Sequence, residues 1–343
     1  MDRAKGCGRT AGFDAARLAA AGLIFFQHGC SILDRDDWPV VAGLRVGRVG
    51  TVTFFALSGY LAAATPQTPE VWLWRRLRKL YPAYWVVLAA CFLANAAGGY
   101  KSFDEGHVVA QFLGIALFTH SGPLVYTITW FLSALLVSYL LAYLALRNPG
   151  VVPLAAAGGV VVALSVNPFS TVAALALPFW VGFVAARAGR FRVVALLAGG
   201  AGFAAMSALD PDSRYGAVAL PLLAAATFWP GDCRAGRWFA GYAWEWYLVH
   251  ALCLHAVVRC GGDAPAVLFP AAALLSVGSA VALRHGLAVA LARLSGRGVP
   301  FRPPAWLVAG VVWGPARLAA PRPTPADAPA RRNGPPTPVS DAV

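Results

Sequence analysis

Runs of apolar residues long enough to cross a membrane recur along most of this chain. Each run is bounded by a short segment rich in charged residues, proline or glycine. A helix that spans a bilayer needs roughly 20 mostly apolar residues. The pattern predicts an all-α integral membrane protein, a single bundle of about ten transmembrane helices. We expect these spans at residues 13–33, 47–65, 80–98, 128–147, 151–166, 171–187, 193–208, 215–229, 238–258 and 265–290.

A shorter apolar segment, VVAQFLGIALFT at residues 108–119, is predicted as an interfacial or re-entrant helix because it is too short to span a bilayer. The basic residues support this interpretation. With ten spans and a cytoplasmic amino terminus, most Arg and Lys residues of the connections fall on the cytoplasmic side. A full span at 108–119 would reverse every later connection and remove that bias. We therefore expect a multi-pass protein with both termini in the cytoplasm. The expected location is a cell membrane, the bacterial inner membrane in the first instance.

The chain is predicted to have three parts. Residues 1–12 form a cytoplasmic amino-terminal segment, and residues 13–296 form the polytopic membrane domain. Residues 297–343 are rich in Pro, Ala and Arg, a composition that cannot bury an apolar core. We expect this last segment to be a disordered cytoplasmic tail.

Composition excludes several other classes of protein. Hydrophobic residues make up 59% of the chain and charged residues 13%, whereas a soluble domain carries about 25% charged residues. The net charge of +13 would suggest nucleic acid as the partner of a soluble protein. Here most basic residues lie between apolar runs, so membrane lipid, and no nucleic acid, is the expected partner. The six cysteines form no CxxC pair, and we expect no metal site.

The first apolar run carries three ionisable residues, Asp14, Arg17 and His28. Ionisable groups inside a span are costly and mark functional candidates. Arg17 and His28 are eleven residues apart, which places them about 20° apart around a helix and roughly 16 Å apart along it. They therefore share one helix face. The alternative is an Arg that extends to the membrane interface beside a hydrogen-bonded core His.

The second apolar run contains Ser58 followed by Gly59, small residues that favour close helix packing. A dense cationic segment, WLWRRLRKLYP, follows it. Its basic side chains either anchor the topology or bind phosphate groups, for which paired Arg side chains are suited. The two roles are compatible. The basic residues of this segment are Arg75, Arg76, Arg78 and Lys79.

Near the end of the membrane domain, Glu245 and His250 share one apolar run. Both are costly there unless they line a polar cavity. Five residues place them roughly 140° apart around a helix, so we expect no direct pairing between them. The sequence contains no GxSxG, Walker or HExxH motif, and so it does not support a serine nucleophile or a metal mechanism.

Four segments together resemble the membrane acyltransferase-3 family of O-acyltransferases. FDAARLAAAGLIFFQH is similar to the family's first-helix signature, with Arg17 and His28 at its R-x10-H spacing. VGTVTFFALSGYL is similar to its phenylalanine-rich second helix. RRLRKLYPAYW is similar to its basic loop before the third helix, and WYLVH to a late Tyr-Leu-x-His segment. The resemblance covers residues 13 to about 290.

Two positions depart from the family pattern. Lys79 occupies the second Arg position of the frequent R-x-x-R-x-x-P loop. Many members carry W-S-L-x-x-E in a middle helix, and here Leu135 occupies the position of that Glu. The second departure bears on the class of acceptor.

The resemblance implies transfer of an acyl group, usually acetyl, from a cytoplasmic coenzyme A thioester to a hydroxyl group. The acceptor would be a sugar on a lipid-linked or surface glycan, or a glycosylated metabolite. Acetyl-CoA or another acyl-CoA would be a co-substrate, and no permanently bound cofactor is expected. The alternatives are a transporter or flippase of an anionic lipid-linked saccharide, and an inactive membrane scaffold.

The charged residues fit this chemistry. His28 is the expected catalytic base, because imidazole, with an unperturbed pKa near 6.5, is largely neutral at cytoplasmic pH. It would act either directly or through an acyl-histidine intermediate, and the sequence does not separate these routes. The expected acyl-donor-binding residues are Arg17, Arg75, Arg76, Arg78 and Lys79. Residues expected at the acceptor cavity or in support are Asp14, Ser58, Trp130, Glu245, Tyr247 and His250.

Overall fold

The structure is a computed structural model that describes residues 11–65, 67–98, 105–119, 130–148, 150, 170–208, 210–229 and 233–294. The predicted span 151–166 and the predicted tail 297–343 lie outside the described residues, as do residues 1–10.

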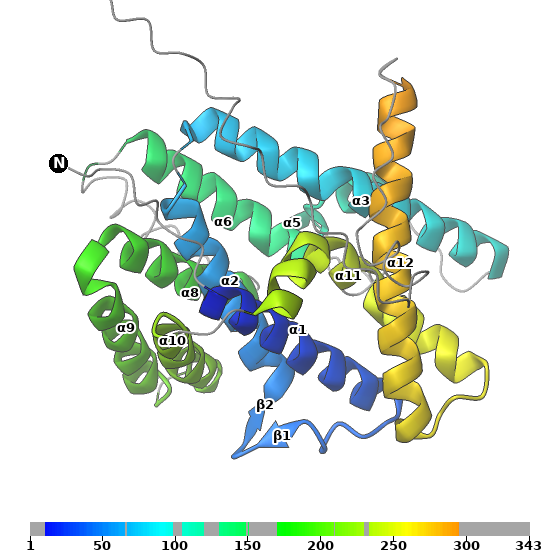
Figure 1. Ribbon diagram of the computed structural model, residues 1–343, viewed down its shortest axis with the longest axis horizontal. Coiled ribbons are helices and arrows are strands. Elements are labelled where there is room, and N and C mark those ends of the chain that lie inside the picture. Colours follow the sequence, from blue (N-terminus) through cyan, green and yellow to red (C-terminus); the bar gives the residue numbers. More distant parts are fainter. Residues whose placement is uncertain are drawn as a thin grey trace, which may run out of the picture. The chain divides into compact units, whose positions relative to one another are not determined.

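The described residues are almost entirely helical (Figure 1). Every predicted span other than 151–166 falls on a helix. Two 3-10 turns, η2 (Gly189–Phe191) and η3 (Pro211–Ser213), precede α9 and α10. The helices are α1 (Ala11–Ile32), α2 (Val46–Ala63), α3 (Pro69–Gly98), α4 (Glu105–Leu113), α5 (Ala116–Thr119), α6 (Trp130–Arg147), α8 (Ser170–Arg187), α9 (Arg192–Met206), α10 (Arg214–Ala226), α11 (Arg234–Arg259) and α12 (Pro265–Leu294).

Within the described residues, five helical segments are long and apolar enough to cross a membrane: α2, α3, α6, the segment Gly189–Met206, and α12. This agrees with a multi-pass all-α membrane protein, although it does not confirm the predicted count of about ten spans. Two helices outside the five, α1 and α11, contain the candidate site residues Asp14, Arg17, His28, Glu245 and His250. These polar side chains lower the hydropathy of the helices that carry them.

The third span begins earlier than predicted. The sequence pattern placed its start at residue 80, after a basic loop, but α3 begins at Pro69 and includes the whole cationic segment and Pro82. Arg, Lys and Leu are good helix formers, and proline is tolerated inside membrane helices. A helix of 30 residues is about 45 Å long. Since the hydrocarbon core is about 30 Å thick, the basic turns of α3 can extend beyond it.

The apolar segment 108–119 does not form a spanning helix. It is divided between α4 and α5, of nine and four residues, at Gly114, whose φ is +73°. A positive φ is accessible to glycine at little cost and ends the first helix there. The structure therefore agrees with the prediction that this segment does not cross the membrane.

A small hairpin between α1 and α2 was not predicted. Strands β1 (Val40–Val41) and β2 (Leu44–Arg45) pair antiparallel, with Val40 opposite Arg45. Ala42 and Gly43 between them both have positive φ values, of 49° and 74°. Such a pair is typical of a two-residue hairpin turn.

Helices α2 and α8 approach each other closely through two glycines. A side chain at Gly59 would collide with the backbone carbonyl of Phe179, and one at Gly182 would collide with that of Ala56. Small residues at such crossings let two membrane helices pack backbone to backbone. The close approach predicted for the Ser58–Gly59 step is therefore present, and its partner is α8.

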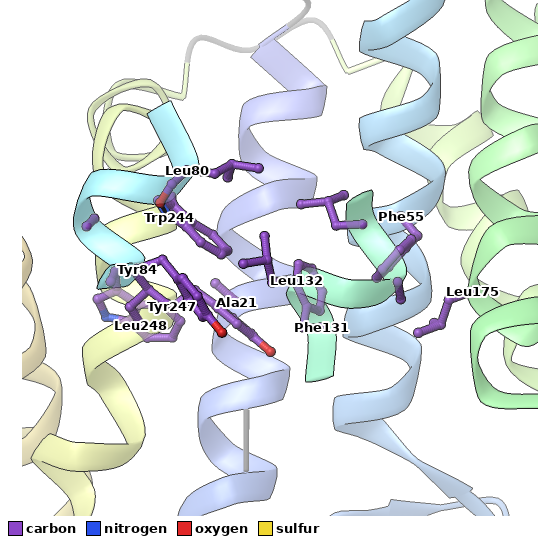
Figure 2. Packing of buried hydrophobic residues seen from close by; sticks show 14 of the residues in the cluster. Ala21, Phe55, Leu80, Tyr84, Phe131, Leu132, Leu175, Trp244, Tyr247 and Leu248 are labelled. Carbon is purple, nitrogen blue, oxygen red and sulfur yellow. Dashed lines mark hydrogen bonds between the residues drawn. The ribbon is translucent and has the colours of Figure 1, made fainter. Parts of the chain in front are cut away.

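A buried aromatic core fixes α11 against α2, α3 and α6. Figure 2 shows Phe131 of α6 between Phe55 of α2 and Tyr247 of α11, with ring centroids 4.9 Å and 4.5 Å away. Trp244 of α11 donates a hydrogen bond of 2.9 Å to the carbonyl oxygen of Leu80 on α3. Each aromatic pair contributes about 0.5–1.5 kcal/mol beyond its buried area. The polar residues of α11 are therefore held on a rigid element.

Helices α1 and α11 pack side by side and run in the same direction (Figure 1). Gly236 at the start of α11 lies against the backbone of Asp14 at the start of α1. Fourteen positions later on both helices, His28 meets His250. The first and ninth spans of the ten-span prediction also share a direction, whereas a full span at 108–119 would have made them antiparallel.

Candidate functional site

The structure joins His28 of α1 to His250 of α11, which are 222 residues apart in the sequence. His28 Nδ1 lies 2.8 Å from His250 Nε2. The two ring planes are within 10° of parallel, with centroids 5.0 Å apart. A nitrogen–nitrogen distance this short is that of a hydrogen bond. We call these two side chains the histidine pair.

His250 is completely enclosed. It is 0% exposed, and Trp246, Tyr247 and Phe25 place their rings 4.9, 5.5 and 6.4 Å from it, centroid to centroid. Its Nδ1 lies 2.7 Å from the backbone carbonyl oxygen of Tyr247. His28 is only partly buried. His28 is therefore the more accessible member of the pair.

A second group of charged side chains gathers around Lys79 of α3. Lys79 of α3 lies within electrostatic range of one carboxylate, Glu245 of α11, and of three further cations. These residues come from four helices, α1, α3, α11 and α12. We call this group the cationic cluster, and its members are Arg17, Arg76, Lys79, Glu245 and Arg284.

Two of the predicted donor-binding arginines are held in place within the cluster. Arg17 forms an ion pair of 3.3 Å with Asp14, which is 1% exposed and lies in the first turn of α1. A carboxylate is favourable at a helix amino terminus. Arg76 lies over the rings of Trp72 and Tyr139, at 5.9 and 5.7 Å. Both guanidinium groups are therefore positioned before any ligand binds.

The sequence analysis missed Arg284. Its guanidinium lies 5.1 Å from the ring centroid of Tyr242. In the part of the chain that the structure describes, its buried Nη1 has no hydrogen-bond partner, and neither has the buried Oε2 of Glu245. Unpaired buried polar atoms cost free energy, which an arriving ligand can recover. The signal was available in the sequence, since Arg284 is an ionisable residue inside the apolar run 265–290.

Other predicted site residues lie elsewhere. Arg75 and Arg78 are exposed on α3, away from the partly buried Arg76. Ser58 is partly buried beside Gly59 on α2. Trp130 packs edge-on against Phe131 at 6.1 Å. As predicted from their spacing, Glu245 and His250 do not pair, because one belongs to the cationic cluster and the other to the histidine pair.

Leu135 lies where many family members carry a Glu. It is 4% exposed and belongs to the main apolar core of the described residues. A carboxylate at this place would be buried among apolar side chains unless it found a partner. This protein fills the position by packing.

The cationic cluster and the histidine pair offer two different chemical functions. Arg17 and His28 are eleven residues apart, roughly 16 Å along α1. The cationic cluster can bind an anion, and the histidine pair can accept or donate a proton. Across the described ranges of the chain, no three His, Cys, Asp or Glu side chains gather as metal ligands would.

Comparison with known proteins identifies one family. A family model described as an acyltransferase domain, that of the acyltransferase-3 family, matches residues 10–285. This range includes the histidine pair and the whole cationic cluster. No curated protein and no solved structure matches the chain.

Proposed function

Because the chain belongs to the acyltransferase-3 family of membrane acyltransferases, we propose that it moves an acyl group, acetyl in the first instance, from acyl-CoA to a hydroxyl group. The acceptor is a sugar on a lipid-linked or surface glycan, or a glycosylated metabolite. The observation that supports this most is the presence of a histidine pair on α1 and α11 together with a cationic cluster to which the same two helices contribute Arg17 and Glu245.

The cationic cluster binds the phosphates of the acyl donor. Coenzyme A carries its phosphates at one end of a long flexible arm and the thioester at the other. Arg76, Lys79 and Arg284 offer charge-assisted donors from two helices, and each phosphate contact is worth about 1.5–3 kcal/mol. Arg17 adds a fourth cation, held in place by Asp14. The offset of roughly 16 Å along α1 then suits a donor whose thioester reaches His28.

His28 is the base for the transfer. The acceptor hydroxyl oxygen attacks the thioester carbonyl carbon while His28 takes the hydroxyl proton. The carbon–sulfur bond then breaks, and the coenzyme A thiolate leaves and receives that proton. If His28 attacks the thioester first, the same residue carries the acyl group before the hydroxyl does. Both routes give an ester and a free thiol.

Glu245 borders the acceptor in this proposal. Its buried Oε2, which has no hydrogen-bond partner among the described residues, can accept a hydrogen bond from a sugar hydroxyl. The cationic cluster faces the cytoplasm, where acyl-CoA is made, and both chain termini lie on that side of a bacterial inner membrane. Ser58, Trp130 and Tyr247 support the acceptor cavity.

Acceptor-dependent release of free coenzyme A tests the proposal. The purified protein is placed in lipid nanodiscs with acetyl-CoA and a panel of lipid-linked and free saccharides, and the thiol and the acetylated product are measured. We expect both only with an acceptor, and neither from the His28→Ala protein. Movement of a saccharide across a vesicle membrane without acetyl-CoA consumption would instead show a transporter, and no acetylation of any acceptor would favour a scaffold.

A further inference from the structure

The hydrogen bonds of the histidine pair determine where its protons lie. His250 Nδ1 lies 2.7 Å from the backbone carbonyl oxygen of Tyr247. A carbonyl oxygen can only accept a hydrogen bond, so Nδ1 of His250 must carry a proton. A second proton would place an imidazolium ion among aromatic rings with 0% exposure, which is costly. His250 is therefore neutral, and its Nε2 presents a lone pair.

The state of His28 follows from that lone pair. Its Nδ1 lies 2.8 Å from His250 Nε2, which can only accept, so His28 Nδ1 must donate a proton. The neutral ring of His28 then has its lone pair on Nε2. Among the described residues, none forms a hydrogen bond with that nitrogen.

We propose that His250 is a positioning residue that holds His28 in the tautomer with a basic Nε2. The chain of hydrogen bonds runs from His28 through His250 to the Tyr247 carbonyl. This inference rests on the proposed function, because it assigns the reacting nitrogen of the base. When Nε2 takes the hydroxyl proton, the Nδ1 proton of His28 already has an acceptor, so the imidazolium ion is stabilised without any rearrangement.

The arrangement also explains why the orienting group is a second histidine. In serine proteases a carboxylate orients the catalytic histidine, and the wrong tautomer costs about 10⁴ in turnover. A carboxylate at position 250 would be buried among Trp246, Tyr247 and Phe25. A neutral imidazole accepts the same hydrogen bond without burying a charge inside the membrane.

Two substitutions separate orientation from packing. His250→Leu fills the space but removes the acceptor, and turnover should fall on the order of 10²-fold or more. In His250→Gln the side-chain oxygen can accept from His28 Nδ1, so turnover should stay within about tenfold of the wild type. Leu252→Ala is the control, since Leu252 lies exposed on the same helix, two positions beyond His250. Affinity for a non-hydrolysable acyl-CoA analogue should be unchanged in all three proteins.

Nitrogen-15 magnetic resonance of labelled histidine reads the tautomer directly and needs no substrate. In the wild type, the His28 signal, assigned by its loss in His28→Ala, should show a protonated Nδ1 and an unprotonated Nε2. His250→Leu should give a mixture of tautomers. A protonated Nε2 in the wild type would overturn the proposal, as would normal turnover in folded His250→Leu, or equal losses in the Leu and Gln proteins. If the protein transfers no acyl group, the proposed function is wrong. The magnetic resonance measurement would still show which nitrogen of His28 carries the proton.

Discussion

The cationic cluster and the histidine pair hold their polar groups in opposite ways. In the cationic cluster, positive charges outnumber carboxylates, Lys79 is exposed, and buried polar atoms of Arg284 and Glu245 lack partners within the described residues. In the histidine pair, neutral rings have their protons placed by successive hydrogen bonds. A site that binds a charged ligand keeps charges and hydrogen-bonding atoms free for that ligand, whereas a catalytic base needs its protons on defined nitrogens. The predictions below test that division, from the largest effect to the smallest.

Removing the proposed base should have the largest effect. His28→Ala should reduce turnover by roughly 10²–10⁴-fold, the usual contribution of a general base. Turnover in membranes measures this loss. Donor binding should survive, since the cationic cluster is untouched, and a thermal-shift titration with a non-hydrolysable acyl-CoA analogue measures it. A correctly inserted His28→Ala protein with near-normal turnover would leave His28 as a core histidine.

Removing one cluster cation should change donor binding and leave saturated turnover nearly intact. Arg76→Ala should raise the KM for acyl-CoA by about 10- to 150-fold, which corresponds to a lost phosphate contact of about 1.5–3 kcal/mol. The KM for acceptor should change much less. Arg75→Ala is the matched control, because Arg75 is the exposed neighbour of the partly buried Arg76. Equal KM values for acyl-CoA in the two variants would indicate that the cationic segment of α3 only anchors the topology.

Arg284 should behave like Arg76 although it comes from a different helix. Arg284→Gln should raise the KM for acyl-CoA by about tenfold, because a neutral amide loses the charge but keeps a donor. Arg293→Gln, an exposed position on the same helix, is the control and should leave the KM unchanged. If Arg284→Gln instead lowers turnover at saturating donor, the cationic cluster and the histidine pair are not separate in function.

Glu245 should separate donor from acceptor. Glu245→Gln should raise the KM for acceptor several-fold, since an amide oxygen is a weaker acceptor than a carboxylate. The KM for acyl-CoA should fall slightly, because Glu245 is the one carboxylate among the described residues that acts on Lys79. Initial rates measured while each substrate is varied in turn give the two KM values separately. An unchanged acceptor KM would make Glu245 a structural partner of the cluster.

The orientation of α11 in the membrane can be tested without altering the candidate site. Cys260 is exposed in the turn between α11 and α12, at the end of α11 away from the cationic cluster. A membrane-impermeant maleimide should label it in intact cells, with no change in turnover, and Cys260→Ser should remove that label. Labelling only after the membrane is opened would reverse the proposed orientation.

The sequence predicted single-helix features well and contacts between helices poorly. The apolar runs located the described helices, and the R-x10-H spacing placed Arg17 and His28 on one face of α1. The start of α3 was wrong by eleven residues because a cationic, helix-forming segment has the composition of either a loop or an interfacial helix. A helical wheel shows one helix at a time, so it could not bring His250 to His28 across 222 residues. Arg284 was overlooked because its run carried no recognised motif.

The equal register of α1 and α11 limits how the chain can change in length. Asp14 to His28 and Gly236 to His250 are both fourteen positions, or two heptads. One inserted residue in either stretch would rotate everything beyond it by about 100° and shift it by about 1.5 Å. An insertion in α1 would therefore separate the histidines unless α11 gained one too. Related proteins that keep both contacts should differ here by substitution alone, while the turns outside these stretches are free to lengthen.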